Sequence, residues 1–155
     1  MGIELRTSGF NPVQELAVYQ EKVVGRSGKF GAVISFVGTM RDFNEDRAVQ
    51  GMILEHYPGM TEKHLQLIHD EAMQRWEILD ALVIHRVGEI RPGEPIVLVA
   101  VWSAHRAAAF EACRYLIEEL KTRAPFWKNE QHHATTHWVE HNTPVTQIAA
   151  TRLVK

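Results

Sequence analysis

Residues 96–102 have the sequence Ile-Val-Leu-Val-Ala-Val-Trp and are apolar at every position. A short run that is rich in β-branched residues and lacks polar positions is typical of a strand with both faces buried. We therefore predict a central strand here. Residues 31–40 and 79–87 are nearly as apolar and predict two more strands, and we expect the first of these to be covered on both faces as well.

Amphipathic helices are predicted between these strands. In residues 61–76, apolar side chains recur at spacings of three and four, which indicates a helix with Thr61 as its N-cap. A second helix is predicted over residues 104–121 with Ser103 as its N-cap. Its expected buried stripe consists of Ala107, Phe110, Cys113 or Arg114, Ile117 and Leu120. A short helix begins at Asn11 and Pro12.

The order of these elements predicts the α+β class with a largely antiparallel sheet. Adjacent strand pairs alternate with helices, whereas a doubly wound parallel sheet would alternate single strands with helices. We expect a single domain over residues 1–155, in which residues 142–155 form a tail that is ordered only where it docks.

One local pairing and one loop also follow from the sequence. Residues 49–57 predict a strand that pairs antiparallel with residues 31–40, because a loop of only about seven residues separates the two. Residues 129–136 are polar and rich in histidine, so they predict a loop before a short strand at residues 138–140.

The composition excludes several classes of function. Apolar residues make up 45% of the 155 residues, which is ordinary for a domain with its own core. A net charge of −2 supplies no overall field for nucleic acid or anionic membrane, so an anion site must be a local cluster. The one cysteine, Cys113, permits no internal disulfide and is best interpreted as a core residue. Neither a signal-peptide pattern nor an apolar run of ~18 residues occurs, and we expect a cytoplasmic protein.

Residues 121–128, Lys-Thr-Arg-Ala-Pro-Phe-Trp-Lys, form such a cluster, and we call them the exit segment. Pro125 ends the preceding helix, and two large aromatics separate Lys128 from Lys121 and Arg123. A lysine that is partly desolvated beside other cations has a lowered pKa and can act as a base or nucleophile. The alternative is that Lys121 merely complements the helix dipole.

Arg41, His105 and Arg106 are further candidates, because each follows a predicted strand. His105 and Arg106 open the helix that Lys121 closes, and a helix of this length spans roughly 25 Å. Either the chain after Pro125 returns along the helix, or a second protomer supplies one end of the site. This geometry predicts an oligomer.

The histidines allow a different hypothesis. Three of His132, His133, His137 and His141 are spaced by four, and histidine alone can hold zinc. However, the stretch contains two threonines and is a poor helix, so solvated histidines are the simpler interpretation.

Several strings in the chain resemble the MoaE family, the large catalytic subunit of molybdopterin synthase. The similarity covers about residues 31–140. It is carried by Phe-Val-Gly-Thr-Met-Arg-Asp-Phe-Asn at 36–44, Leu-Glu-His-Tyr-Pro-Gly-Met-Thr-Glu at 54–62, Ile-His-Arg-Val-Gly at 84–88, Ser-Ala-His-Arg at 103–106 and Leu-Lys-Thr-Arg-Ala-Pro-Phe-Trp-Lys at 120–128.

The resemblance implies a sulfurtransferase with an α/β hammerhead fold and a small antiparallel β subdomain. Such enzymes transfer sulfur to cyclic pyranopterin monophosphate (precursor Z) and so form the dithiolene of molybdopterin. The donor is a thiocarboxylate at the C-terminal Gly-Gly of a small ubiquitin-like subunit, MoaD-like in type. Large subunits form a homodimer, and the whole assembly is a heterotetramer. No cofactor or resident metal is implied.

The resemblance also assigns roles to residues. Lys121 matches the lysine taken as catalytic. Lys128 matches a second lysine that is important for activity. The residues that hold the phosphate and pterin are matched by Arg41, His105 and Arg106. Some members carry an arginine where this chain has His141 and Asn142. The competing hypothesis is a non-catalytic module that binds a small anion or a partner's C-terminal tail with the same cations.

Overall fold

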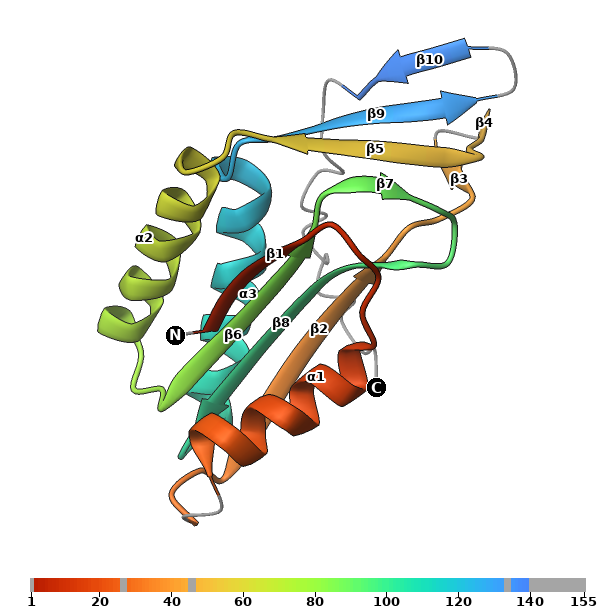
Figure 1. Cartoon of the computed structure of the whole chain (residues 1–155). Coiled ribbons are helices and arrows are strands. Elements are labelled where there is room, and N and C mark those ends of the chain that lie inside the picture. Colours follow the sequence, from red (N-terminus) through yellow and green to blue (C-terminus); the bar gives the residue numbers. More distant parts are fainter. Residues whose placement is uncertain (1, 26–27, 45–46, 133–134, 140–155) are drawn as a thin grey trace, which may run out of the picture.

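The computed structural model describes residues 2–25, 28–44, 47–132 and 135–139, which form two four-stranded sheets and a small hairpin. The larger sheet contains β1 (Gly2–Arg6), β6 (Asp80–Arg86), β8 (Pro95–Ser103) and β2 (Ala32–Thr39) in the order β1-β6-β8-β2 (Figure 1). Only the β1–β6 pair is parallel, and the other two pairs are antiparallel. The central position predicted for residues 96–102 is confirmed, because they belong to β8, which has β6 on one side and β2 on the other.

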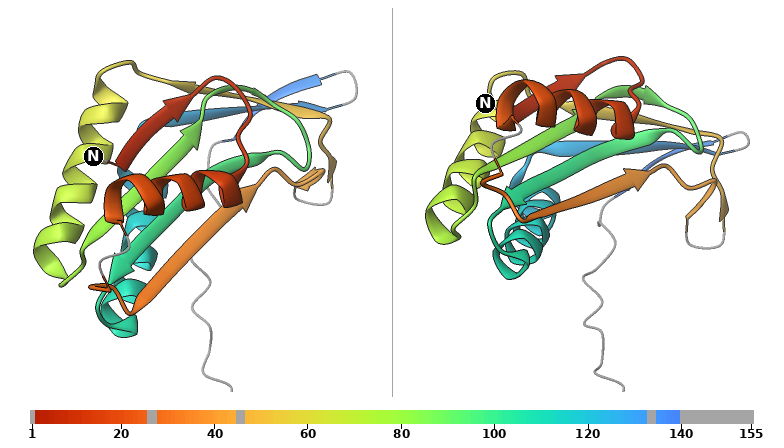
Figure 2. Two further views of the ribbon diagram at one scale, coloured as in Figure 1. Left: turned by 60° about the horizontal axis from the view of Figure 1, so that its bottom comes forward. Right: turned by 90° about the horizontal axis from the view of Figure 1, so that it is seen from below.

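Helices cover both faces of this sheet. α2 (Met60–Arg75) and α3 (Arg106–Arg123) pack on one face, while α1 (Pro12–Tyr19) and the π-helical turn η1 (Gln20–Val24) lie on the other (Figure 2). Burial along β8 follows the strand period of two. Val97, Val99 and Val101 face α2 and α3, and Leu98, Ala100 and Trp102 face α1. The predicted α+β class with largely antiparallel sheets is confirmed.

The smaller sheet lies across one end of the larger one (Figure 1) and has the order β10-β9-β5-β7. Its strands are β5 (Gly51–His56), β7 (Gly88–Ile90), β9 (Phe126–His132) and β10 (Thr135–Trp138). All of its pairings are antiparallel. A separate core cluster fills the space beneath this sheet, with Met40, Val49, Met52, Leu54 and Ile90 as its buried members. No described helix combines the length and the apolar character needed to cross a bilayer.

Two local predictions are wrong, namely the pairing of residues 49–57 with residues 31–40 and the loop at residues 129–136. β2 pairs with β8, and β5 lies in the other sheet between β9 and β7. The chain between them forms the hairpin of β3 (Phe43–Asn44) and β4 (Arg47–Ala48). Residues 129–132 belong to β9 instead of a loop, because backbone pairing with β5 supports a strand whose side chains are polar. Polar side chains are compatible with an antiparallel sheet that is open to water on one face.

β2 is not covered on both faces, contrary to the prediction for residues 31–40. It is the edge strand of the larger sheet, and Phe36 and Val37 in its middle are 37% and 42% exposed. An apolar edge strand of eight residues is a template for pairing with another chain.

Asn11 is the N-cap of α1 as predicted, whereas the N-caps predicted for α2 and α3 are displaced by local geometry. Gly59, with φ of 81°, is the N-cap of α2, and its N–H donates to the Glu62 carboxylate at 2.6 Å. Thr61 is instead fully buried inside the first turn. Ser103 ends β8, and His105 is the N-cap of α3.

The buried stripe of α3 is rotated from the predicted one. Phe110 is 59% exposed, whereas the buried positions are Ala109, Ala112, Cys113, Leu116, Ile117 and Leu120. Burial raises the pKa of the Cys113 thiol to about 11, which agrees with its interpretation as a core residue.

Two leucines on α2 provide a matched test of this packing. Leu65 is 2% exposed and lies in the core between the helices and the sheet, and Leu67 is 53% exposed. We expect Leu65→Ala to lower the free energy of unfolding by about 2–5 kcal/mol, because it leaves a cavity. Leu67→Ala should change it by no more than about 0.5 kcal/mol. Urea unfolding measures both, and equal losses would contradict the described orientation of α2.

Candidate active site

Lys128 lies in β9, opposite Leu54 of β5, at the end of the smaller sheet next to α3. Cross-strand partners point to the same face, and Leu54 is almost fully buried, so Lys128 faces inward. Burial lowers the pKa of Lys128, and the positive charges of Lys121 and Arg41 lower it further. Glu130 opposes this shift.

These charge effects show that Arg41, Lys121 and Lys128 form one cluster within a single protomer. Arg41 follows β2, Lys121 extends from the last turn of α3, and Lys128 follows the turn that Pro125 begins. Three of the five predicted site residues are therefore brought together by elements distant in sequence. Lys121 and Arg41 are exposed, and Lys128 is only partly so.

His85 of β6 forms the buried side of the cluster, a position for which no role was predicted. Its ring stacks on Phe126 with centroids 4.0 Å apart, and its Nδ1 donates to the Arg86 carbonyl at 2.7 Å. Burial first, and then the charges of Lys128 and His56, lower the pKa of His85 to about 4. His85 is therefore neutral at physiological pH and adds no further charge. His56 and His85 belong to no periodic pattern of the sequence. His56 lies in the family-like string at 54–62, and His85 lies in the one at 84–88.

Arg123 does not belong to this cluster, although the exit segment was predicted to act as one cationic cluster that includes it. Its two terminal nitrogens donate to both Glu71 oxygens, at 2.6 and 3.1 Å, and one of them also reaches Glu119 at 3.1 Å. Glu71 additionally accepts the hydroxyl of Tyr115. Arg123 therefore joins the end of α3 to α2 and is not available for a ligand.

His105 and Arg106 lie at the opposite end of α3 from Lys121. Lys121 follows Arg106 by 15 residues and His105 by 16, which puts it about 22–24 Å from them at 1.5 Å per residue. The first of the two alternatives, a return of the chain along the helix, does not occur among the described residues, because β9 leads into the smaller sheet (Figure 1). One protomer does not bring these two residues to the lysines.

The proposed histidine metal site is supported by nothing in the described part of the chain, where no cluster of metal-binding side chains occurs. His132 is engaged elsewhere, with Nδ1 donating to the Ala48 carbonyl at 3.0 Å. The side chains of His133 and His137, together with His141 and Asn142, lie outside the described residues.

The cluster is suited to an anionic ligand. Three cations that repel one another are stabilised together when a phosphate or carboxylate binds between them. Lysine and arginine also offer donors that match phosphate oxygens.

The electrostatic coupling of the two lysines can be tested directly. Removing the charge in Lys121→Met should raise the pKa of Lys128, because the protonated form then faces less repulsion. The pKa should stay below that of a free lysine, since burial is the larger cause. NMR titration of the lysine side chains measures this, with Lys63→Met on the exposed face of α2 as the control. An unchanged pKa of Lys128 would show that the two amines are not close.

Comparisons with known proteins agree with these features. The model of the family described as "MoaE protein" matches residues 11–123. A molybdopterin synthase catalytic subunit of Pseudomonas aeruginosa is 52% identical over 140 residues, which cover 90% of this chain and 91% of the relative.

Solved structures also match. A MoaE protein of Burkholderia ambifaria has a TM-score of 0.74 at 43% identity and covers 89% of this chain and 88% of its own. Molybdopterin synthase of Staphylococcus aureus has a TM-score of 0.78 at 30% identity, over 89% of this chain and 96% of that one. The chain belongs to the MoaE family.

Proposed function

We propose that this chain is the catalytic subunit of a molybdopterin synthase, which transfers sulfur to cyclic pyranopterin monophosphate. The donor is the thiocarboxylate at the C-terminus of a small ubiquitin-like subunit. One observation carries the proposal: Lys128 is partly buried, with its pKa lowered by burial and by Lys121 and Arg41. Catalytic subunits of this synthase are relatives at 52% and 57% identity.

The reaction places specific demands on these side chains. The thiocarboxylate sulfur attacks a ring carbon of the substrate and forms the carbon–sulfur bond, while the carbon–oxygen bond at that carbon breaks and the departing oxygen takes up a proton. Water then cleaves the acyl–sulfur bond, which releases the tail as a carboxylate and leaves the sulfur on the product. Lys128 and Arg41 hold the substrate phosphate, and Lys121 exchanges protons with the reacting carbons or stabilises the departing carboxylate. The nucleophile arrives with the partner, so the enzyme needs no thiol of its own.

The remaining two site residues are best supplied by a second protomer. β2 begins at Ala32, which pairs with Ser103 just before His105, and it ends at Thr39, just before Arg41. If two β2 edges pair antiparallel about a twofold axis, the start of one lies beside the end of the other. The partner subunit's His105 and the partner subunit's Arg106 then lie near Arg41. In this homodimer the exposed Phe36 and Val37 are covered.

The proposal includes a cytoplasmic location. The one cysteine, Cys113, is a buried thiol, which is compatible with a reducing compartment.

Lys121→Ala distinguishes an enzyme from a binding module. In a reconstituted reaction with a thiocarboxylated small subunit and precursor Z, we expect the rate of dithiolene formation to fall about 100-fold or more. Binding of the small subunit should be retained, because the other cations remain. Lys63→Ala removes an exposed lysine of α2 and should have wild-type turnover. Unchanged turnover in Lys121→Ala would favour the non-catalytic alternative.

A further inference from the structure

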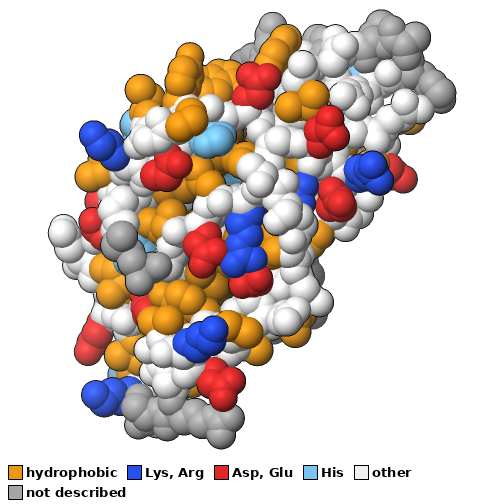
Figure 3. All heavy atoms as spheres, in the orientation of Figure 1, with side chains coloured by type: hydrophobic (Ala, Val, Ile, Leu, Met, Phe, Trp, Pro, Cys, Tyr) orange, Lys and Arg blue, Asp and Glu red, His pale blue; other side chains and the backbone are white. Residues whose placement is uncertain are grey.

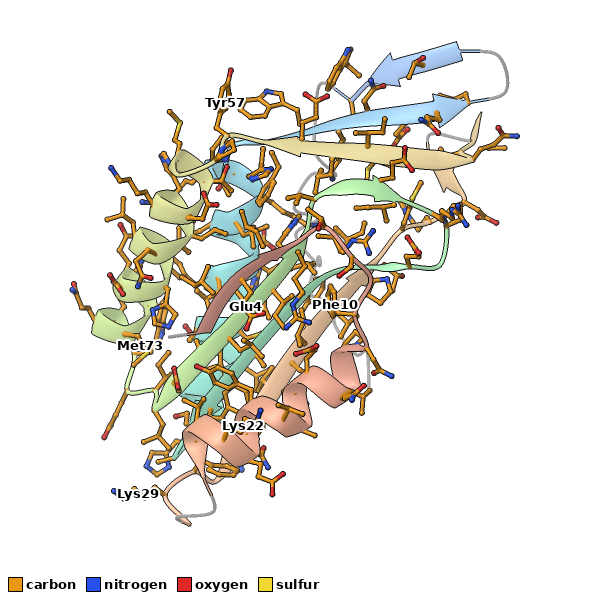
Figure 4. All side chains as sticks on the ribbon, in the orientation of Figure 1. Glu4, Phe10, Lys22, Lys29, Tyr57 and Met73 are labelled. Atoms are coloured by element: carbon orange, nitrogen blue, oxygen red, sulfur yellow. The ribbon has the colours of Figure 1, made fainter. Side chains whose placement is uncertain are left out.

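Residues 54–62 lie along the second half of the exit segment. In the β5–β9 pairing, Leu54, Glu55 and His56 are opposite Lys128, Trp127 and Phe126. Tyr57 then meets Trp127 edge to face, with ring centroids 4.7 Å apart. Figure 4 shows Tyr57 at the turn between β5 and α2, and Figure 3 shows apolar side chains gathered over this corner. The conformation of the exit segment is therefore set by a neighbour that is distant in sequence.

Thr61 links this neighbour to the exit segment through a side-chain hydrogen bond. Its hydroxyl donates to the Pro125 carbonyl at 3.3 Å and accepts from the Tyr57 N–H at 3.2 Å. Thr61 has no exposed surface, so water does not compete for these bonds. Pro125 lies between the two lysines of the site, four residues after Lys121 and three before Lys128.

The position of the hydroxyl is itself determined by the start of α2. Gly59 has the positive φ that this turn requires, and its N–H is bonded to Glu62. The Thr61 N–H also donates to the Tyr57 carbonyl, at 2.9 Å. These bonds fix the Thr61 backbone, and they place its side chain against Pro125.

We propose that Thr61 is a positioning residue: its hydroxyl holds the Pro125 carbonyl and thereby sets the separation and direction of the Lys121 and Lys128 amines. The inference rests on the proposed function for its catalytic consequence. Its structural part, the restraint of the exit segment, stands independently of what the lysines do. It also explains the presence of a threonine at a helix start where a glycine already serves as N-cap.

The variant that removes the hydroxyl should still fold. Thr61→Val keeps the shape of the side chain, and the pairing of β9 with β5 and the stack of Phe126 on His85 remain. Thr61→Ser keeps the hydroxyl and loses only a methyl group. Tyr19→Phe is the control for stability, because it removes a hydroxyl that donates to Asp80 at 3.0 Å, away from the exit segment.

Two measurements on the full chain test the proposal. The first is hydrogen exchange of peptides covering residues 54–60 and 124–130, which needs no substrate. The second is kcat/KM in the reconstituted sulfur transfer. In Thr61→Val we expect exchange in both peptides to accelerate and kcat/KM to fall about tenfold, as a small misplacement of catalytic groups does. Thr61→Ser should restore both to within about twofold of wild type, and Tyr19→Phe should leave both unchanged.

Three outcomes would overturn the proposal. Wild-type exchange at residues 124–130 in Thr61→Val would show that the hydroxyl does not restrain the segment. A loss in Thr61→Ser equal to that in Thr61→Val would show that the hydroxyl is not the active feature. If Tyr19→Phe accelerated exchange and lowered kcat/KM as much as Thr61→Val, the effect would come from lost stability alone. If the wild type transfers no sulfur, the proposed function fails, and the exchange experiment still decides the restraint.

Discussion

The site depends on holding the Lys128 ammonium partly out of water beside two other cations. Burial and like charge both disfavour the protonated lysine, so this arrangement opposes folding locally. Other interactions must offset the cost, and they are the ones that converge on β9: its pairing with β5, the Phe126–His85 stack and the Thr61 bond to Pro125. A bound anion relieves the repulsion. The same unfavourable electrostatics that weaken the empty site therefore favour binding of a phosphate or carboxylate.

The sequence predicts the parts of this fold that are determined by local hydrophobic pattern. β8 is apolar on both faces, and its central place follows directly from that property. α2 shows its periodicity plainly. The cationic exit segment is equally visible, because Pro125 and the two lysines occur within eight residues.

The features that the sequence does not predict depend on long-range pairing. β9 has polar side chains and becomes a strand because β5 supplies its backbone partners. Arg123 looks like a ligand residue, but α2 places Glu71 within reach of both its terminal nitrogens. His85 carries no periodic signal, and only the meeting of β6 with β9 brings it to the lysines. The apolar side chains of β2 predict burial within one chain, whereas in the proposed dimer a second copy of the chain buries them.

The most direct test of a shared site is complementation between two inactive variants. In the proposed dimer, Lys121→Ala and His105→Ala damage different halves of each site, so a mixed dimer retains one intact site of its two. Random co-assembly of equal amounts makes half of the dimers mixed, and about a quarter of wild-type sulfur transfer should return. Activity no greater than that of the separate variants would contradict a site built from Lys121 of one protomer and His105 of the other.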